Sequence, residues 1–204
     1  NAVMNGGGLK DHSNDELAAI MAGKKVGVGF SMTDRFFLLS GNTNREDLET
    51  QLQLQTAYLM HPGYRQDGVT LLRRAIPMIY NKMDHEVQGA MKKQVPAILY
   101  KNNPRFTFPT QEQLTSYQVK DVRDWVDAPL KNNYIEVTFT GDFRTEDIIP
   151  LLERTVGAVP KRAEAPATLD ETLRHPAMAD FNFSKDLTYD SSIDKTMVCL
   201  FWKT

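Results

Sequence analysis

The stretch NTNREDLETQLQLQTAYLMHPGY, residues 42–64, has the most regular helical pattern in the sequence. Leu48, Leu52 and Leu59 recur at steps of four and seven residues, which places them on one face of a helix. The HPG triplet at residues 61–63 ends the pattern, because proline and glycine do not continue a helix. The stretch therefore predicts an amphipathic helix with one face against a core.

Four stretches outside this helix have the composition and alternation of β-strands. KKVGVGF (24–30) and RFFLLSG (35–41) are separated by a short polar link, which predicts a hairpin. In YIEVTFTGD (134–142) apolar residues alternate with polar ones, and TMVCLFW (196–202) is an apolar run. Strands interspersed with helices predict an α/β (α+β) fold in which helices pack on a largely antiparallel mixed sheet.

Two capping-box patterns mark predicted helix starts. Ser13 is followed three residues later by Glu16, which predicts a short helix over residues 12–22. Thr43 and Glu46 have the same spacing at the start of the helix described above. Both patterns predict a side chain that accepts a hydrogen bond from the first turn.

Further helices follow from apolar periodicity. The longest runs from about residue 67 to residue 100, where Pro77 should introduce a kink and Pro96 a break. Two others are predicted over residues 115–126 and 145–157.

GVG at residues 27–29 is half of a dinucleotide-binding fingerprint. Its third glycine would be residue 32, which is Met32, and no helix start follows. We therefore expect these glycines to lie in a strand that another group approaches closely.

Composition and charge are those of an ordinary globular chain. The 204 residues are 41% hydrophobic, and 24 basic against 26 acidic residues leave a net charge of −2. This balance gives no electrostatic footprint for nucleic acid or an anionic membrane, and no apolar run approaches the roughly 18 residues of a membrane span. The single cysteine, Cys199, excludes an internal disulfide but does not decide the compartment. Because the chain opens with NAV, we expect a piece of a longer protein whose targeting signal is not visible here.

MDHEVQG, residues 83–89, opens like the zinc-binding helix of a metallopeptidase. H-E-x-x-H needs a second histidine four residues after His85, and that position is Gly89. The inverted H-x-x-E-H fails as well, because residue 88 is Gln88. The other histidines, His12, His61 and His175, complete neither pattern. We expect His85 to be a solvent-facing or hydrogen-bonded histidine, and a metal enzyme that uses His85 and Glu86 with a distant third ligand is the least favoured hypothesis.

Three segments, in their order along the chain, resemble the insulinase/pitrilysin family of zinc metallopeptidases, and in particular bacterial processing-peptidase-like zinc proteases. The segments are DELAAIMAGK (15–24), EDLETQLQLQTAYL (46–59) and EVTFTGDF…LLERTVGAVPKR (136–162). The resemblance implies a peptidase of two homologous halves, each with two α/β domains, that close around a substrate chamber. The catalytic half of that family carries H-x-x-E-H, and this chain looks like the companion half, which usually lacks it.

The resemblance also implies a division of the chain. Residues 1–162 would match the first domain of the companion half, and residues 163–204 the linker and opening strand of a following domain. No catalytic, metal-binding or substrate-binding residue of the family can be assigned to a position of this chain. Zinc is expected only in the catalytic half of the parent protein.

The implied function is that of a non-catalytic domain that helps form the chamber enclosing peptide substrates. The parent is expected to be a zinc metalloendopeptidase, and whether this chain is itself an enzyme stays open. Expected partners are peptide substrates and the catalytic half, in the same polypeptide or in a partner subunit. By resemblance, the location is the periplasm or cell envelope of a bacterium. The alternative is a binding or scaffold protein with the same fold and no peptidase activity.

Overall fold

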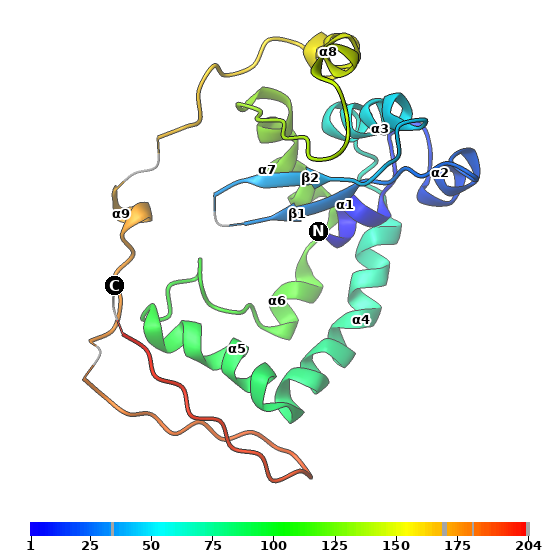
Figure 1. Cartoon of the computed structure of the whole chain (residues 1–204). Helices are drawn as coiled ribbons and strands as arrows, with labels where there is room; N and C mark the ends of the chain where they lie inside the picture. The colour runs from blue at the N-terminus through cyan, green and yellow to red at the C-terminus, as the bar shows by residue number, and fades with distance from the viewer. Residues whose placement is uncertain (34, 169–170, 181, 203–204) are drawn as a thin grey trace. The chain divides into compact units, whose positions relative to one another are not determined.

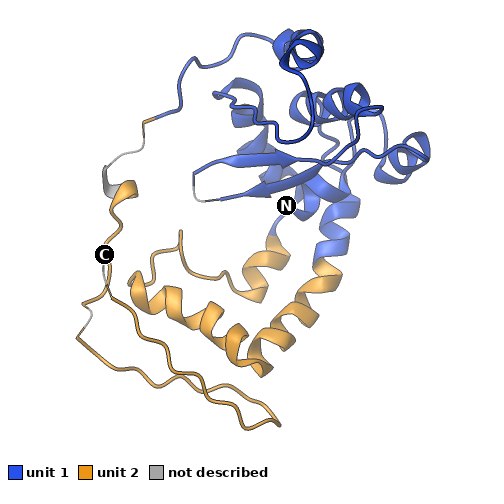
Figure 2. Cartoon of the chain, viewed as in Figure 1, with its two compact units in different colours: residues 1–72, 117–167 blue, residues 73–116, 168–204 orange. Residues whose placement is uncertain are grey.

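The computed structural model describes residues 1–33, 35–168, 171–180 and 182–202. The chain divides into two compact units, which Figure 2 shows in different colours. Unit 1 comprises Asn1–Leu72 and Tyr117–Ala167, and unit 2 comprises Arg73–Ser116 and Thr168–Thr204. Each unit is therefore assembled from two separate stretches of the chain.

Unit 1 contains the β-hairpin and the helices that cover it (Figure 1). In chain order its elements are α1 (Ala2–Gly6), α2 (Asn14–Ile20), β1 (Gly29–Met32), β2 (Phe37–Ser40), α3 (Leu48–Met60), the start of α4 (Gln66–His85), α7 (Val119–Asn132), α8 (Thr145–Arg154) and a 3-10 turn (Val156–Ala158). The capping box predicted for α2 is confirmed. The Glu16 amide donates to the Ser13 hydroxyl oxygen at 3.2 Å, and the Ser13 amide donates to the Glu16 carboxylate at 2.7 Å.

The start of α3 differs from the sequence prediction. The box of Thr43 and Glu46 does not form, and α3 begins only at Leu48, after an Asp47 whose side chain makes no cap bond. The Asp47 carboxylate instead accepts the backbone amide of Lys25 at 2.8 Å. A contact to a distant segment thus replaces a local cap, whereas the end of α3 at Met60 agrees with the prediction.

The predicted hairpin is confirmed. β1 and β2 pair antiparallel in a register that runs from Gly29 opposite Ser40 to Met32 opposite Phe37. Phe30 is 3% exposed. Alternate residues of the hairpin therefore face the core, as the period of two requires.

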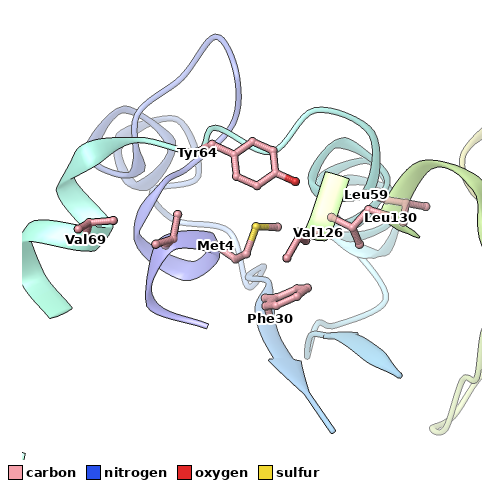
Figure 3. Packing of buried hydrophobic residues seen from close by; sticks show 8 residues of the cluster. Met4, Phe30, Leu59, Tyr64, Val69, Val126 and Leu130 are labelled. Carbon is pink, nitrogen blue, oxygen red and sulfur yellow. The ribbon is translucent and has the colours of Figure 1, made fainter. Parts of the chain in front are cut away.

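The core of unit 1 lies between this hairpin and helices α1, α3 and α7 (Figure 3). It is made of buried apolar side chains from segments far apart in the sequence: Val3, Met4, Phe30, Leu59, Tyr64, Val69, Val126 and Leu130. Burial of apolar area stabilises the fold by about 25 cal/mol per Å². Helices therefore cover the face of the hairpin that carries Phe30.

Unit 2 contains the rest of α4, together with α5 (Val87–Leu99), α6 (Gln111–Ser116) and α9 (Glu171–Arg174). The helical stretch predicted over residues 67–100 breaks at Glu86, and the prediction that Pro96 breaks it was wrong, because Pro96 lies inside α5. The break at Glu86 depends on Gly89. A Cβ at residue 89 would lie 2.4 Å from the Cα of Met83, so glycine lets the start of α5 approach the end of α4 closely.

Two predicted strands, Tyr134–Phe139 and Met197–Trp202, lie outside the strands of the described residues, so their prediction as strands was wrong. A strand exists only where a second backbone supplies the ladder of hydrogen bonds, and no described segment pairs with either one. Ile135 still packs against the core of unit 1. The predicted fold class is confirmed, because helices pack on an antiparallel sheet, here of two strands.

Candidate functional site

His85 and Glu86 lie at the corner between α4 and α5 in unit 2. His85 Nδ1 lies 2.7 Å from the carbonyl oxygen of Asn81, and Nε2 lies 3.7 Å from the Asp190 carboxylate. Glu86 faces Lys82 at 3.9 Å. Among the residues that the structure describes, no three His, Cys, Asp or Glu side chains gather closely enough to hold a metal ion. The groups around His85 therefore do not fit zinc.

A more distinctive polar arrangement surrounds residues 24–28, which lead into β1 and are called the approach segment below. Its edge on the β2 side, toward α3, is held by side chains. The Lys25 amide donates to Asp47 at 2.8 Å, while the Gly27 amide donates to Gln51 Oε1 at 2.9 Å and the Gly27 carbonyl accepts from Gln51 Nε2 at 2.8 Å. Gln51 is only 3% exposed. A side-chain amide thus replaces the strand that would otherwise pair at Gly27.

On the opposite edge of β1, the Asn5 side chain likewise takes the place of a pairing strand. Its Nδ2 donates to the Phe30 carbonyl at 3.0 Å, and its Oδ1 accepts the Phe30 amide at 2.6 Å. Residues an even number apart in an extended chain present their backbone groups to the same edge. The amide and carbonyl groups of Val26 and Val28 share this edge with Phe30, and they have no hydrogen-bond partner in the described part of the chain. These four groups are called the open edge below.

The side chains of the approach segment alternate between two environments. Val26 and Val28 pack, partly buried, against a small apolar cluster. The cluster consists of Leu17, Leu54 and Tyr58. Lys25, Gly27 and Gly29 are exposed on the other face, and a Cβ built on Gly27 would meet no atom within 4 Å. The exposed face is therefore free of side-chain cover at Gly27.

A hollow of about 670 Å³, called the hairpin hollow below, lies between the approach segment and the end of β2. It is lined by residues 24–29 together with Ser40, Gly41 and Asn42. Gly27 contributes no side chain to this hollow, and a Cβ at that position would meet nothing within 4 Å.

Two lysines line the hairpin hollow, and they differ in charge compensation. Lys24 Nζ lies 3.5 Å from the Asp47 carboxylate. The Lys25 amide that donates to Asp47 holds the pKa of that carboxyl below its ordinary value of 3.8, and the Lys24 ammonium lowers the pKa further. Asp47 is therefore ionised at neutral pH and compensates Lys24. The Lys25 ammonium has no carboxylate within 4.0 Å among the described residues.

Sequence reasoning identified part of this site. It predicted a close approach to the glycines at 27–29, and the Gln51 amide makes such an approach at the backbone of Gly27. It missed Asn5 and Gln51 as the groups that close the neighbouring positions. A signal for Gln51 exists, because this polar residue lies three and seven residues before Leu54 and Tyr58, on the buried face of α3.

A second, apolar hollow of about 290 Å³ lies against α8. Its lining residues are Val137, Ile149, Leu152, Glu153, Val156 and Gly157. Val137 belongs to one of the segments predicted as strands, so this segment presents an apolar side chain toward α8 without being part of the sheet.

Comparison with known proteins relates this fold to proteases. No family model matches the chain. The chain is 21% identical over 145 residues to the chloroplast stromal processing peptidase of Pisum sativum. The aligned region makes up 70% of this chain and 12% of that protein. Its structure matches that of the ferredoxin protease FusC in complex with Arabidopsis ferredoxin, with a TM-score of 0.62, 16% identity and 82% of this chain covered. It matches a protease from Helicobacter pylori with the same TM-score and coverage at 14% identity.

The chain thus has a processing-peptidase-like fold. It spans only 12% of the length of the plant peptidase, 18% of the FusC chain and 41% of the Helicobacter pylori chain. At these identities the structural matches establish the architecture alone. Within the described residues, every helix is too short or too polar to cross a bilayer.

Proposed function

We propose that this chain is a non-catalytic module of a zinc metallopeptidase of the insulinase/pitrilysin type, and that it helps to enclose peptide substrates. The observation that carries the proposal is the shared fold with two proteases over 82% of the chain. Weak sequence similarity to a processing peptidase supports the same class. The sequence contains no H-x-x-E-H, and under this proposal the chemistry belongs to another part of the parent protein or to a partner subunit.

In this role the chain contributes surface rather than catalytic groups. A chamber wall holds an extended peptide through backbone hydrogen bonds and shallow pockets, and it keeps bulk water away from the scissile bond. In unit 1, the open edge offers backbone hydrogen-bond groups to such a peptide, and the hairpin hollow offers a shallow pocket. Under this proposal residues 163–204 lead into a following domain, zinc belongs to the catalytic half, and the location is the bacterial cell envelope.

Zinc content and peptidase activity of the purified chain test the proposal. We expect no stoichiometric zinc after dialysis and no cleavage of a quenched fluorescent peptide library by the chain alone. The matched measurement uses the parent protein, or the chain mixed with its catalytic half, and should show cleavage that a chelator abolishes. Tightly held zinc with hydrolysis by the isolated chain contradicts the proposal.

The missing zinc motif also fits a second function, that of a binding or scaffold protein with this fold. The sequence of the whole parent gene and its neighbours separates the two. An H-x-x-E-H helix in either place favours the peptidase module, and its absence from both favours the scaffold.

A further inference from the structure

We infer that the open edge of Val26 and Val28 binds an extended peptide as an added β-strand, and that Lys25 selects an acidic side chain in that peptide. The inference rests on the proposed function and names the class of peptide that this surface of unit 1 would hold. Its three supports are the unpaired backbone groups, the environment of the two faces and the distribution of charge.

The backbone supplies the first support. Val26 and Val28 each present one N–H donor and one C=O acceptor on the same edge, and none of these has a partner among the described residues. The neighbouring backbone groups already have partners. The Asn5 side chain bonds the amide and carbonyl of Phe30 on this edge, and the Gln51 side chain bonds those of Gly27 on the other edge. The free groups are therefore confined to one short edge that matches the ladder of an incoming strand.

The two faces of the hairpin determine which side chains such a strand can carry. Alternate side chains of an added strand point to opposite faces. On one face they meet Val26, Val28 and the apolar cluster beneath them, which favours an apolar side chain. On the other face they lie beside Gly27, which lines the hairpin hollow and leaves room for a longer side chain.

Charge decides what the longer side chain should be. Lys24 is compensated by Asp47 at 3.5 Å, whereas Lys25 on the rim of the same hollow has no carboxylate partner among the described residues. A glutamate or aspartate of the peptide would supply the missing negative charge. The favoured ligand is therefore an extended segment in which acidic and apolar residues alternate.

The probe is a fluorescein-labelled peptide of sequence Ser-Gly-Val-Glu-Val-Glu-Val-Gly-Ser, titrated with the whole chain and followed by fluorescence anisotropy. One comparison peptide has glutamine in place of both glutamates. A second comparison peptide keeps the glutamates but has N-methyl groups on the backbone nitrogens of one edge, which removes its hydrogen-bond donors. We expect the N-methylated peptide to bind roughly tenfold more weakly, as the loss of about two net hydrogen bonds implies.

Protein variants assign the effect to the residues named here. Lys25→Gln should weaken the binding of the acidic peptide roughly two- to fivefold, the range of an exposed ion pair, and should leave the glutamine peptide unchanged. Lys10→Gln is the matched control, because Lys10 is another exposed lysine of unit 1 outside the hairpin hollow. Val28→Pro removes an N–H that has no partner among the described residues, so it should weaken both peptides. Circular dichroism shows whether this variant folds, and the N-methylated peptide tests the edge without it.

Each result has a distinct meaning. Equal affinity of the N-methylated and unmodified peptides overturns strand addition, and equal affinity of the glutamate and glutamine peptides overturns the role of Lys25. Dimerisation of the chain that the peptide does not displace, with no peptide bound, assigns the edge to a second copy and also overturns the inference. Cleavage of the probe by the chain alone counts against the proposed function, while the effects of N-methylation and of Lys25→Gln still report on the edge.

Discussion

The hairpin of β1 and β2 and the segment Met197–Trp202 have similar apolar sequences but different surroundings. In the hairpin, Phe30 is 3% exposed and lies in the core of unit 1. In the C-terminal segment, Val198 is 83% exposed and Leu200 is 80% exposed. An apolar run thus indicates which residues prefer to be buried. It forms a paired strand only where a second strand supplies hydrogen bonds and helices cover its apolar face.

Replacing one aromatic residue in each region tests this difference most strongly. Phe30→Ala should lower the free energy of unfolding by about 3–5 kcal/mol, because it leaves a cavity among the core residues. Trp202→Ala should change it by less than about 0.5 kcal/mol, because Trp202 is 73% exposed. Urea titration followed by circular dichroism measures both. A similar loss for the two variants would show that the C-terminal segment is also packed in solution.

Two glycines of the hairpin hollow sharpen the comparison within the hairpin itself. A Cβ on Gly41 would lie 2.2 Å from Gln51 Nε2 and 2.5 Å from the Gly27 carbonyl oxygen, whereas a Cβ on Gly27 meets nothing within 4 Å. Gly41→Ala should therefore cost about 1–3 kcal/mol through overpacking, and Gly27→Ala should stay within about 0.5 kcal/mol. Thermal unfolding of the pair measures the difference. Equal melting temperatures would mean that Gln51 does not occupy the space between the two glycines.

The cap of α2, the helix that precedes the approach segment, should contribute less. Ser13→Ala removes the hydroxyl that accepts the Glu16 amide and should cost about 1 kcal/mol. Ser116→Ala is a useful comparison in unit 2, because its hydroxyl donates to the Gln113 carbonyl near the end of α6 and caps no helix start. If Ser13→Ala lowers the free energy of unfolding no more than Ser116→Ala does, the cap does not stabilise this region.

The same cap predicts a pH dependence. The Ser13 amide, and then the Ser13 hydroxyl, lower the pKa of Glu16 below its ordinary value of 4.5. A carboxyl whose pKa is lowered by folding contributes stability above its unfolded pKa and loses it as the pH falls through its folded pKa. The stability difference between the parent chain and Glu16→Gln should therefore be present at neutral pH and shrink below about pH 4.5. A difference that is constant from pH 7 to pH 3 would contradict this.

The smallest expected effect is on the surface of unit 1. Arg154 of α8 lies 2.9 Å from Glu49 of α3, and both side chains are at least half exposed. Breaking this pair should cost no more than about 1 kcal/mol, and the loss should fall with added salt. A double-mutant cycle of Arg154→Gln and Glu49→Gln at low and high salt measures it. A coupling above this range would show that α8 is fixed to α3 by charge rather than by apolar contact.

Local sequence signals predicted the elements whose stabilising contacts are themselves local. The capping box at Ser13, the hairpin and the end of α3 are of this kind. The prediction failed at Asp47 because a distant group intervened: its carboxylate accepts the Lys25 amide instead of capping α3. It also failed at Glu86, where the nearby Gly89 permits a corner in the helix that the apolar periodicity does not reveal. Tyr134–Phe139 was wrongly predicted as a strand because alternation describes one chain, whereas a ladder needs two.

The candidate site shows the same limit. The glycines at 27–29 indicated a close approach, but no spacing rule connects Asn5 to Phe30 or Gln51 to Gly27, which lie 25 and 24 residues apart. The open edge is defined by what these two amides leave unpaired. It can be recognised only after both contacts are known.

The sequence by itself determined the helices with strong periodicity, the hairpin, the likeness to a peptidase half and the lack of a paired-histidine zinc motif, since these depend on residues close together in the chain. The tertiary structure decided which backbone groups are satisfied and which stay free. That decision needs three dimensions, because a hydrogen bond forms only between atoms about 3 Å apart, however distant they are in the sequence.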